Sequence, residues 1–418
     1  MMQLGDRRWD HMALLAIGAG ALARGLWIFW LHPPPNYLYS DMQVYVHYAA
    51  ALARGDNLNV YATLQPQGTH LLLALPLAIF GDGRLGLWAA AALWWALSAA
   101  TPFFAWRLTR TLLTPAAAAL TALFAAIWPL HVTNAGYFLS ETPSLAFLVA
   151  ALWLAYGVER RHGGSAVWRG VLAGGLGAIA VACRPQFLLN LAVVVFPFLP
   201  RRLRDRRATL AFAATIVVML AGVVALNSAI AGRLTGLSRE GGVTFYVGQC
   251  HVRQVSMSTP TTSYSIGPPP YVQNGGADVF VPNREVWEEG FFYRRGLDCV
   301  RRKGARYPLH AARMIADMTA TSKPWPQVNE ATLSSVVAAT NTFYGYGLLP
   351  LVVVVALVRI VRRVPTWRGE AVLLAHLLCV VPIVIVFFGD PRFRAPYDLF
   401  GLALAAAALA SQLRRAPR

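Results

Sequence analysis

The segment Phe388-Gly-Asp-Pro-Arg-Phe-Arg-Ala-Pro396 lies between two long apolar stretches near the C-terminus of the chain. It places Asp390, Arg392 and Arg394 at the mouth of the second apolar stretch. A charge at the centre of a membrane helix costs about 2.5–3.5 kcal/mol, so ionisable groups near such a position commonly have a function. Two interpretations are open. The arginines either hold an anionic ligand at the membrane surface or reach out to lipid headgroups.

The composition is that of a membrane protein. Of the 418 residues, 56% are hydrophobic and only 13% are charged, whereas ordinary soluble domains carry about 25% charged residues. Apolar runs near twenty residues recur along the chain, so the sequence predicts an all-α polytopic membrane protein. Met12–Leu31 is too long for the apolar core of a signal peptide and has no small-residue cleavage site after it. We expect it to be the first membrane helix.

The net charge of +18 comes from short basic clusters that alternate with the apolar runs. Such clusters mark the cytoplasmic ends of membrane helices and give no reason to expect a nucleic-acid partner. The six clusters are Arg7-Arg8, Arg107/Arg110, Arg160-Arg161, Arg201–Arg207, Arg359–Arg368 and Arg414–Arg418.

Roughly ten apolar segments are expected to cross the membrane, and a cytoplasmic N-terminus then places all six clusters on the cytoplasmic side. They are Met12–Leu31, Leu87–Trp106, Leu112–Leu130, Thr142–Val158, Val167–Cys183, Pro185–Pro200, Ala208–Ala231, Ser335–Val361, Ala371–Phe388 and Ala395–Leu413. This topology requires that Leu71–Phe80 does not cross. Ten residues span only about 15 Å as a helix, about half of a hydrocarbon core. A re-entrant or interfacial helix is expected there.

Three regions follow from this topology. Residues 1–231 form an N-terminal membrane module, whose first extracytoplasmic loop is 32–84. Residues 232–334 form a large extracytoplasmic loop, and residues 335–418 form a C-terminal segment of three membrane helices. Within the N-terminal module, Gly170-x-x-x-Gly174 is typical of close helix packing.

The large loop has two parts. Thr261–Val281 is rich in Pro, Gly, Ser and Tyr and is expected to be irregular. The stretches from about Arg284 to Lys303 and from Leu309 to Thr321 are amphipathic, with a break at Gly304 and Pro308. They predict two helices lying on the membrane surface.

Cys250 and Cys299 are the only cysteines of the large loop. The compartment expected for this loop permits disulfides. The two residues either form a bridge or are unrelated thiols. Cys183 and Cys379 lie in membrane helices and are expected to be inert.

Two motifs belong to the first extracytoplasmic loop. In Tyr39-Ser-Asp41-Met-Gln-Val-Tyr45, Asp41 could act as a general base toward an acceptor hydroxyl. The pair Ser-Asp is also an ordinary start of a helix. In Gln65-Pro-Gln-Gly-Thr-His70, the histidine could bond a phosphate or a hydroxyl, and the alternative is a turn followed by a helix cap.

Two further motifs lie at helix mouths on the same side. Glu141, in Ser140-Glu-Thr-Pro143, is favoured in a first helical turn by the helix dipole and is also a candidate for binding a sugar hydroxyl or a cation. Arg184-Pro185 places an arginine where the positive-inside rule disfavours one, which indicates an anionic partner.

Together these segments resemble the polytopic GT-C type glycosyltransferases, in the branch that contains dolichyl-phosphate-mannose–protein mannosyltransferases and the bacterial aminoarabinose and lipid-A sugar transferases. The resemblance covers about Asp41–Pro200 and the last helix. It rests on five ordered motifs, which are Asp41, Pro66-Gln-Gly68-Thr-His70, Ser140–Thr142, Arg184-Pro185 and Asp390-Pro-Arg392-Phe393. The turn has Gln where the family usually has a second Pro, and Asp41 is not followed by a second acid. These departures leave the substrate open.

The resemblance implies an inverting transferase that takes a sugar from a polyprenyl-phosphate carrier and passes it to an extracytoplasmic acceptor, which is a lipid, a glycan or a protein. Asp41 would be the base. The residues implied in donor or substrate binding are Glu141, Arg184, Arg392, Arg394, His70 and Tyr45. The lipid-linked sugar would be a co-substrate, and a divalent cation is neither required nor excluded.

Two other classes stay open from the residues alone. One is a polyprenyl-lipid transporter or flippase, and the other is a non-catalytic membrane assembly subunit. Arg greatly outnumbers Lys and Ala is abundant. This composition indicates a GC-rich bacterial genome, and hence a bacterial inner membrane. In the topology given above, the active site would then face the periplasm.

Overall fold

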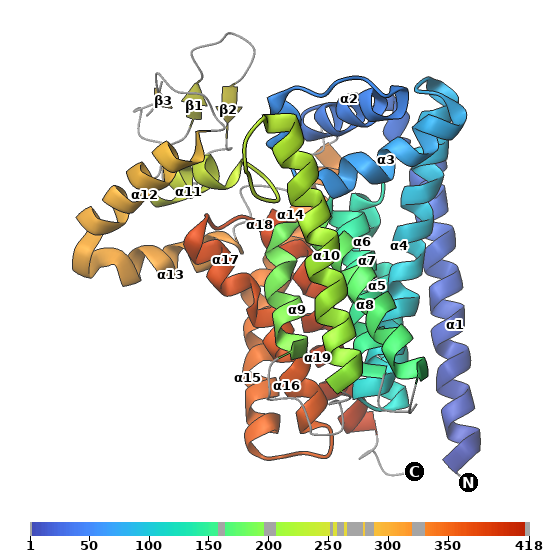
Figure 1. Ribbon diagram of the computed structural model, residues 1–418. Helices are drawn as coiled ribbons and strands as arrows, with labels where there is room; N and C mark the ends of the chain where they lie inside the picture. The colour runs from blue at the N-terminus through green and yellow to red at the C-terminus, as the bar shows by residue number, and fades with distance from the viewer. Residues whose placement is uncertain are drawn as a thin grey trace.

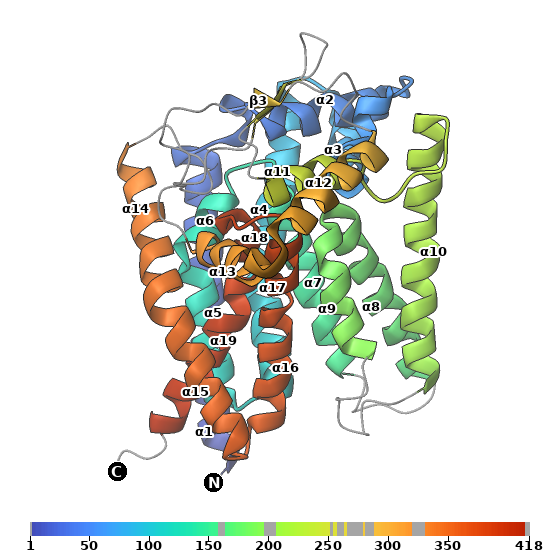
Figure 2. The same ribbon diagram turned by 90° about the vertical axis from the view of Figure 1, so that its left-hand side faces the viewer.

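Helices dominate the structure, a computed structural model that describes residues 2–157, 164–195, 206–250, 254–256, 263–265, 279–280, 288–319 and 331–413. They form a bundle with both ends of the chain at the same end of the molecule (Figures 1 and 2). In the described part of the chain, seven helices are long and apolar enough to cross a membrane, and four shorter apolar helices accompany them. The predicted all-α membrane bundle is confirmed, and each expected crossing segment contains a helix.

The N-terminal module supplies most of the bundle. Its helices are α1 Met2–Leu26 with a π-helical extension Trp27–Leu31, α2 Asp41–Arg54, α3 Gln67–Phe80, α4 Arg84–Leu112, α5 Pro115–Ile127, α6 Pro129–Asn134, α7 Glu141–Tyr156, α8 Gly164–Cys183, α9 Leu188–Val195 and α10 Arg206–Ala231.

Helices α8 and α10 pack closely through the two glycines of the Gly170-x-x-x-Gly174 motif. A Cβ atom at Gly170 would lie 2.3 Å from the carbonyl oxygen of Ala208, and one at Gly174 would lie 2.5 Å from that of Phe212. Any side chain at either position would therefore push α10 away. This is the close packing that the motif predicts.

Helix α3 is longer than its apolar core suggested but is still short. Its 14 residues begin at Gln67 and span about 21 Å as a helix, against a hydrocarbon core of about 30 Å. It lies beside α2 at the end of the bundle opposite the chain termini (Figure 1). We call this end, which also carries α11 and α12, the outer end.

The basic clusters that the structure describes lie at the other end. Arg110, near the end of α4, lies 3.4 Å from Asp10 of α1, and the turn between α15 and α16 lies near the chain termini (Figure 2). This arrangement follows the predicted sidedness. Three of the predicted basic segments, at 160–161, 201–205 and 414–418, lie outside the described residues.

The large loop contributes elements to the outer end. They are α11 Gly241–Cys250, β1 Gln254–Ser256, β2 Ser263–Ser265, β3 Val279–Phe280, α12 Glu289–Lys303 and α13 Tyr307–Asp317. The strand order is β2-β1-β3, antiparallel for β1 with β2 and parallel for β1 with β3.

The two predicted surface helices correspond to α12 and α13, separated at Gly304, whose φ of 49° suits glycine. The expectation that 261–281 is irregular needs correction, because β2 and β3 lie within this stretch and each pairs with β1. The other residues of the stretch, 261–262, 266–278 and 281, lie outside the described part. A disulfide joins Cys250 to Cys299, with 5.4 Å between their Cα atoms.

The C-terminal segment completes the bundle, and its last helix is largely buried. Its helices are α14 Ala331–Thr342, a π-helical turn Phe343–Leu348, α15 Leu349–Val361, α16 Trp367–Leu378, α17 Val380–Val386, α18 Pro391–Arg394 and α19 Asp398–Leu413. Helix α19 packs against α5, α15 and α16. The short helix α18 therefore joins two core helices at the outer end, which is the position that the charged segment needs in order to form a site.

Candidate functional site

Four charged side chains from distant parts of the chain meet at the outer end, and we call them the charged cluster. They are Asp41, Glu141, Arg184 and Arg392. Arg392 Nη1 lies 2.7 Å from Asp41 Oδ2, and its Nε lies 2.7 Å from Glu141 Oε1. Arg184 Nη1 lies 2.6 Å from the same oxygen of Glu141. The formal charges of the cluster balance.

Local backbone features hold each arginine of the cluster. Arg392 follows Asp390, whose Oδ1 accepts a hydrogen bond of 2.8 Å from the Arg392 backbone N–H and so caps α18. Pro391 fills the first helical position, which suits its fixed φ. Arg184 follows the last residue of α8 in an extended conformation, with φ −146°, as expected before Pro185.

The backbone next to Asp41 is strained. Ser40 has φ 50° and ψ −132°, and its side chain makes no cap hydrogen bond to α2. A residue with a side chain in such a conformation costs on the order of 1–3 kcal/mol and persists where the surroundings enforce it. The interpretation of Ser40-Asp41 as an ordinary helix cap therefore does not describe this turn.

A cavity of about 380 Å³ opens beside the charged cluster. Asp41, Arg184 and Arg392 line it, whereas its apolar lining comes from Leu237, Ile383, Phe387, Phe388 and Phe393. The cavity lining thus combines charged groups with apolar side chains. That combination suits an amphipathic ligand with an anionic head.

Burial separates the four charged residues into two pairs. The side chains of Glu141 and Arg184 are 2% and 7% exposed, while those of Arg392 and Asp41 are 25% and 31% exposed. The first pair is thus the more deeply buried, and the second pair is the more accessible from the cavity. In the described part of the chain, no group of three or more His, Cys, Asp and Glu side chains could hold a metal ion.

Tyr45 and His70 occupy successive layers behind the cluster. Tyr45 lies one helical turn after Asp41 and lines the cavity, and burial raises the pKa of its phenol, so it is neutral. The His70 ring packs against Tyr45 and Tyr48, with centroids 5.3 and 5.6 Å away. Its Nδ1 lies 3.1 Å from Oε1 of Gln67.

His70 is fully buried, and burial lowers the pKa of its imidazole to about 3. It is therefore neutral and lies behind Tyr45, away from the cavity lining. The expectation that His70 bonds a phosphate directly needs correction, because the packing of two tyrosines covers its ring.

Arg394 needs a second correction. It is fully buried, its Nε lies 3.0 Å from Oδ1 of Asp398, and its Nη2 donates to Oδ1 of Asn341. Its guanidinium also lies over the Tyr344 ring, 5.0 Å from the centroid. Arg394 thus reaches neither the cavity nor lipid headgroups, because residues two apart on a helix face different ways.

Sequence reasoning missed several residues that line the cavity. They are Gln65, Ser140, Gln186, Glu240, Thr244 and Tyr293. Gln65 and Ser140 belong to predicted motifs and Gln186 directly follows Arg184-Pro185, and that position is a signal that could have identified them. Glu240 and Tyr293 come from the large loop, where no motif singles them out.

Comparisons with known proteins agree with this architecture. The family model described as dolichyl-phosphate-mannose-protein mannosyltransferase matches residues 65–226. A comparison with curated proteins gave no match. Among solved structures, the apo oligosaccharyltransferase of Archaeoglobus fulgidus has a TM-score of 0.54 at 13% identity, covering 96% of this chain and 51% of that one.

The same archaeal enzyme, AglB, in complex with an inhibitory peptide and a dolichol-phosphate, has a TM-score of 0.50 at 14% identity, covering 97% of this chain and 51% of that one. ArnT from Cupriavidus metallidurans bound to undecaprenyl phosphate has a TM-score of 0.40 at 14% identity, with coverages of 97% and 80%. The chain spans about half the length of the archaeal enzyme. At these identities the likeness to the archaeal enzyme is one of fold.

Proposed function

We propose that the chain is a polytopic glycosyltransferase of the GT-C type, and that it transfers a sugar from a polyprenyl-phosphate carrier to an acceptor hydroxyl outside the cytoplasm, with inversion of the anomeric carbon. One observation carries this proposal. Arg392 is shared between Asp41 and Glu141 where charged groups meet a cavity that also has an apolar lining.

The two kinds of cavity lining support this donor class. A polyprenyl phosphate combines an anionic phosphate with an apolar chain, so the arginines match its head and the phenylalanines match its chain. The binding of a dolichol-phosphate by the archaeal AglB supports a carrier of this class. Each guanidinium can offer two parallel N–H groups to phosphate oxygens.

The arginines would also promote the bond cleavage. When the bond between the anomeric carbon and the phosphate oxygen breaks, its electron pair leaves with the phosphate. Arg392 and Arg184 already stand at the cavity and would stabilise that growing negative charge without reorganising. Glu141, which contacts both guanidinium groups, would hold them in position rather than meet the sugar.

Asp41 is the carboxylate that we propose as the base. It lines the cavity and is the more exposed of the two acids in the cluster. A donor phosphate on Arg392 would compete with Asp41 for the guanidinium and release the carboxylate toward the acceptor. Asp41 would then take the proton of the hydroxyl as its oxygen bonds the anomeric carbon. Direct attack by the acceptor gives inversion.

The test uses purified protein in nanodiscs with a panel of polyprenyl-phosphate sugars labelled in the sugar. We expect release of the lipid phosphate from at least one donor in the presence of an envelope extract as acceptor source. Asp41→Asn should lower this turnover by about 100-fold or more, because it keeps the shape and removes the basic oxygen. Donor binding and the unfolding temperature should be retained.

Asp82→Asn is the matched control. Asp82 is an exposed aspartate that pairs with Arg54 on the same end of the molecule, and it should have normal turnover. No donor cleavage by the wild-type protein would overturn the transferase assignment, and movement of labelled lipid across vesicles without cleavage would favour a transporter. Normal turnover in Asp41→Asn would overturn the role of Asp41 as base.

A further inference from the structure

The last turn of α17 is stabilised by a side chain from another helix. The chain leaves the helix at Phe387, so the carbonyl groups of Ile385 and Val386 belong to the set that a helix end leaves without partners from its own helix. Gln249 of α11 donates from Nε2 to both oxygens, at 2.8 and 2.7 Å. Gln249 is fully buried.

Close backbone packing holds the segment after α17, residues 387–389, from two sides. A Cβ atom at Gly248 would lie 1.3 Å from the carbonyl oxygen of Phe387, so α11 touches this segment backbone to backbone. On the other side, a Cβ at Gly389 would lie 2.0 Å from the carbonyl oxygen of Met314 in α13. The segment from Phe387 to Gly389 is thus held between two elements of the large loop.

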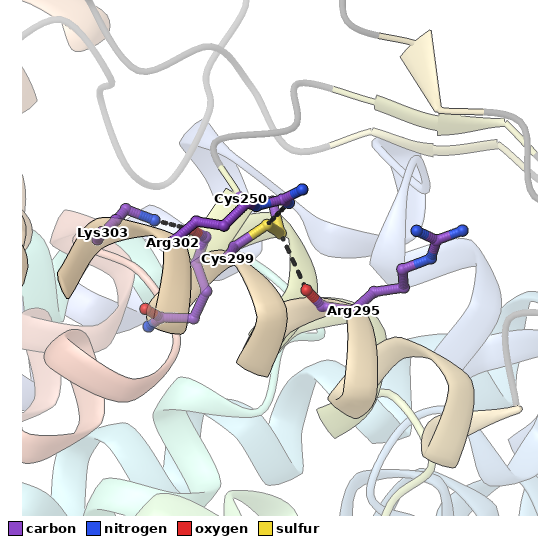
Figure 3. Close-up of a disulfide and its surroundings, with 6 residues drawn as sticks. Cys250, Arg295, Cys299, Arg302 and Lys303 are labelled. Carbon is purple, nitrogen blue, oxygen red and sulfur yellow. Dashed lines mark hydrogen bonds between the residues drawn. A yellow bond between two sulfur atoms is a disulfide. The ribbon is translucent and has the colours of Figure 1, made fainter.

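Gln249 is itself held by its neighbours. The next residue, Cys250, forms the disulfide with Cys299 of α12 (Figure 3). Lys303 of α12 donates from Nζ to the backbone carbonyl of Gln249. We call these four residues the clamp. The clamp ties α11 to α12 through the disulfide and through the hydrogen bond of Lys303. Both links lie beside the Gln249 side chain that caps α17.

We propose that the clamp positions Arg392, with Gln249 as the positioning residue and the disulfide as the part that keeps it in place. This inference rests on the proposed function. The end of α17 and Arg392 are close along the chain. Asp390, which caps the backbone of Arg392, follows Val386 by four residues. Phe387, Phe388 and Arg392 all line the cavity. Movement at the end of α17 would therefore disturb the apolar lining and the phosphate-binding guanidinium together.

A redox dependence follows from the clamp. A dithiol such as dithiothreitol would reduce the bond between Cys250 and Cys299 with two electrons and two protons, giving two thiols and the oxidised, cyclic form of the reductant. The protein would keep its membrane bundle, since α11 and α12 lie outside it (Figure 1). The expected consequence is weaker use of the lipid donor.

The first experiment removes the two hydrogen bonds of Gln249. Gln249→Met keeps the side-chain length without the N–H donors, and it should raise the donor KM about tenfold with a smaller effect on kcat. Asn190→Ala is the matched control. Asn190 is also a fully buried amide, and it donates to the backbone oxygen of His376 at 3.1 Å, inside the bundle. It should lower the unfolding temperature and leave the donor KM unchanged.

The second experiment opens the disulfide in the folded wild-type protein. Dithiothreitol should raise the donor KM by a similar factor. The double variant Cys250→Ser with Cys299→Ser should show the raised KM without reductant and no further response to it. This arm does not depend on whether Gln249→Met folds well.

Amide hydrogen exchange of residues 387–392 separates the inference from the proposed function, because it needs no activity. Faster exchange in Gln249→Met and in the reduced protein supports the clamp. Faster exchange with an unchanged donor KM would overturn the positioning role, and unchanged exchange would overturn the clamp itself. A wild-type protein that cleaves no donor would refute the proposed function, while the exchange result would still report on the clamp.

Discussion

Two clusters of arginine and carboxylate stand at opposite ends of this bundle and are built differently. At the end that carries the chain termini, Arg359 and Glu370 form a closed fork, with Nε to Oε2 and Nη2 to Oε1 both at 2.8 Å. The third nitrogen of Arg359 donates to Ser411 at 2.7 Å. Each oxygen of Glu370 has its own nitrogen, and the arrangement joins α15, α16 and α19.

The charged cluster at the outer end divides its contacts instead. One oxygen of Glu141 faces two guanidinium groups, and Arg392 is split between two carboxylates. A cavity lies beside it. The comparison indicates that a closed fork stabilises the bundle, whereas a divided arrangement at a cavity can exchange a carboxylate for a ligand. An arginine paired with an acid is by itself no evidence for either role.

Replacing Arg392 or Arg359 with alanine should give the largest effects, on turnover in the first case and on stability in the second. Arg392→Ala should lower donor turnover by about 100- to 1000-fold, the range for removing one preorganised donor from a catalytic site. Arg359→Ala should instead lower stability by about 3–5 kcal/mol, because it leaves the buried Glu370 without its partner. The measurements are turnover per folded molecule and denaturant unfolding in detergent. A comparable loss of turnover in folded Arg359→Ala would refute the distinction.

Lysine at neighbouring arginines sharpens the comparison within a single helix. Arg392→Lys keeps the charge but loses the fork, so donor affinity should fall about tenfold with little change in stability. Arg394→Lys should lower stability by about 1–3 kcal/mol, since it disrupts the buried contacts to Asp398 and Asn341, and should leave donor affinity unchanged. Equal losses of donor affinity in both variants would mean that α18 acts as a unit.

Much of the fold could be predicted because its signals are local. Apolar runs and basic clusters identified the helices and their sidedness, and five ordered motifs indicated the outer end as the site. Asp41, Glu141, Arg184 and Arg392 indeed meet there. Helix length alone predicted that α3 would be too short to cross.

The remaining features depend on packing that no local signal carries. Which of the two arginines in the four-residue helix α18 faces the cavity depends on the rotation of that helix about its axis, and the packing of the whole molecule sets this rotation. His70 was misplaced because Tyr45 and Tyr48 cover its ring. Gln249 gave no signal, since its side chain bonds the carbonyl groups of α17, a helix far away in the sequence.

The smallest expected effect concerns backbone strain. It should again differ between the outer end and the end that carries the chain termini. Within the described residues, the non-glycine residues with positive φ are Ser40, at 50°, and Arg363, at 48°. Ser40 precedes Asp41, the proposed base, at the outer end, and Arg363 lies in the turn between α15 and α16. Glycine at either position should relieve strain of on the order of 1–3 kcal/mol, offset by about 0.5–1 kcal/mol of backbone entropy.

Both Ser40→Gly and Arg363→Gly should therefore gain on the order of 1 kcal/mol in stability. Only Ser40→Gly should lower turnover, by a few-fold, because the strained turn holds Asp41 beside Arg392 and glycine would let it move. Denaturant unfolding and donor turnover, measured on the same preparations, provide the test. If Ser40→Gly gains stability and keeps full turnover, the strain does not serve to orient Asp41, and the contact with Arg392 alone places the carboxylate.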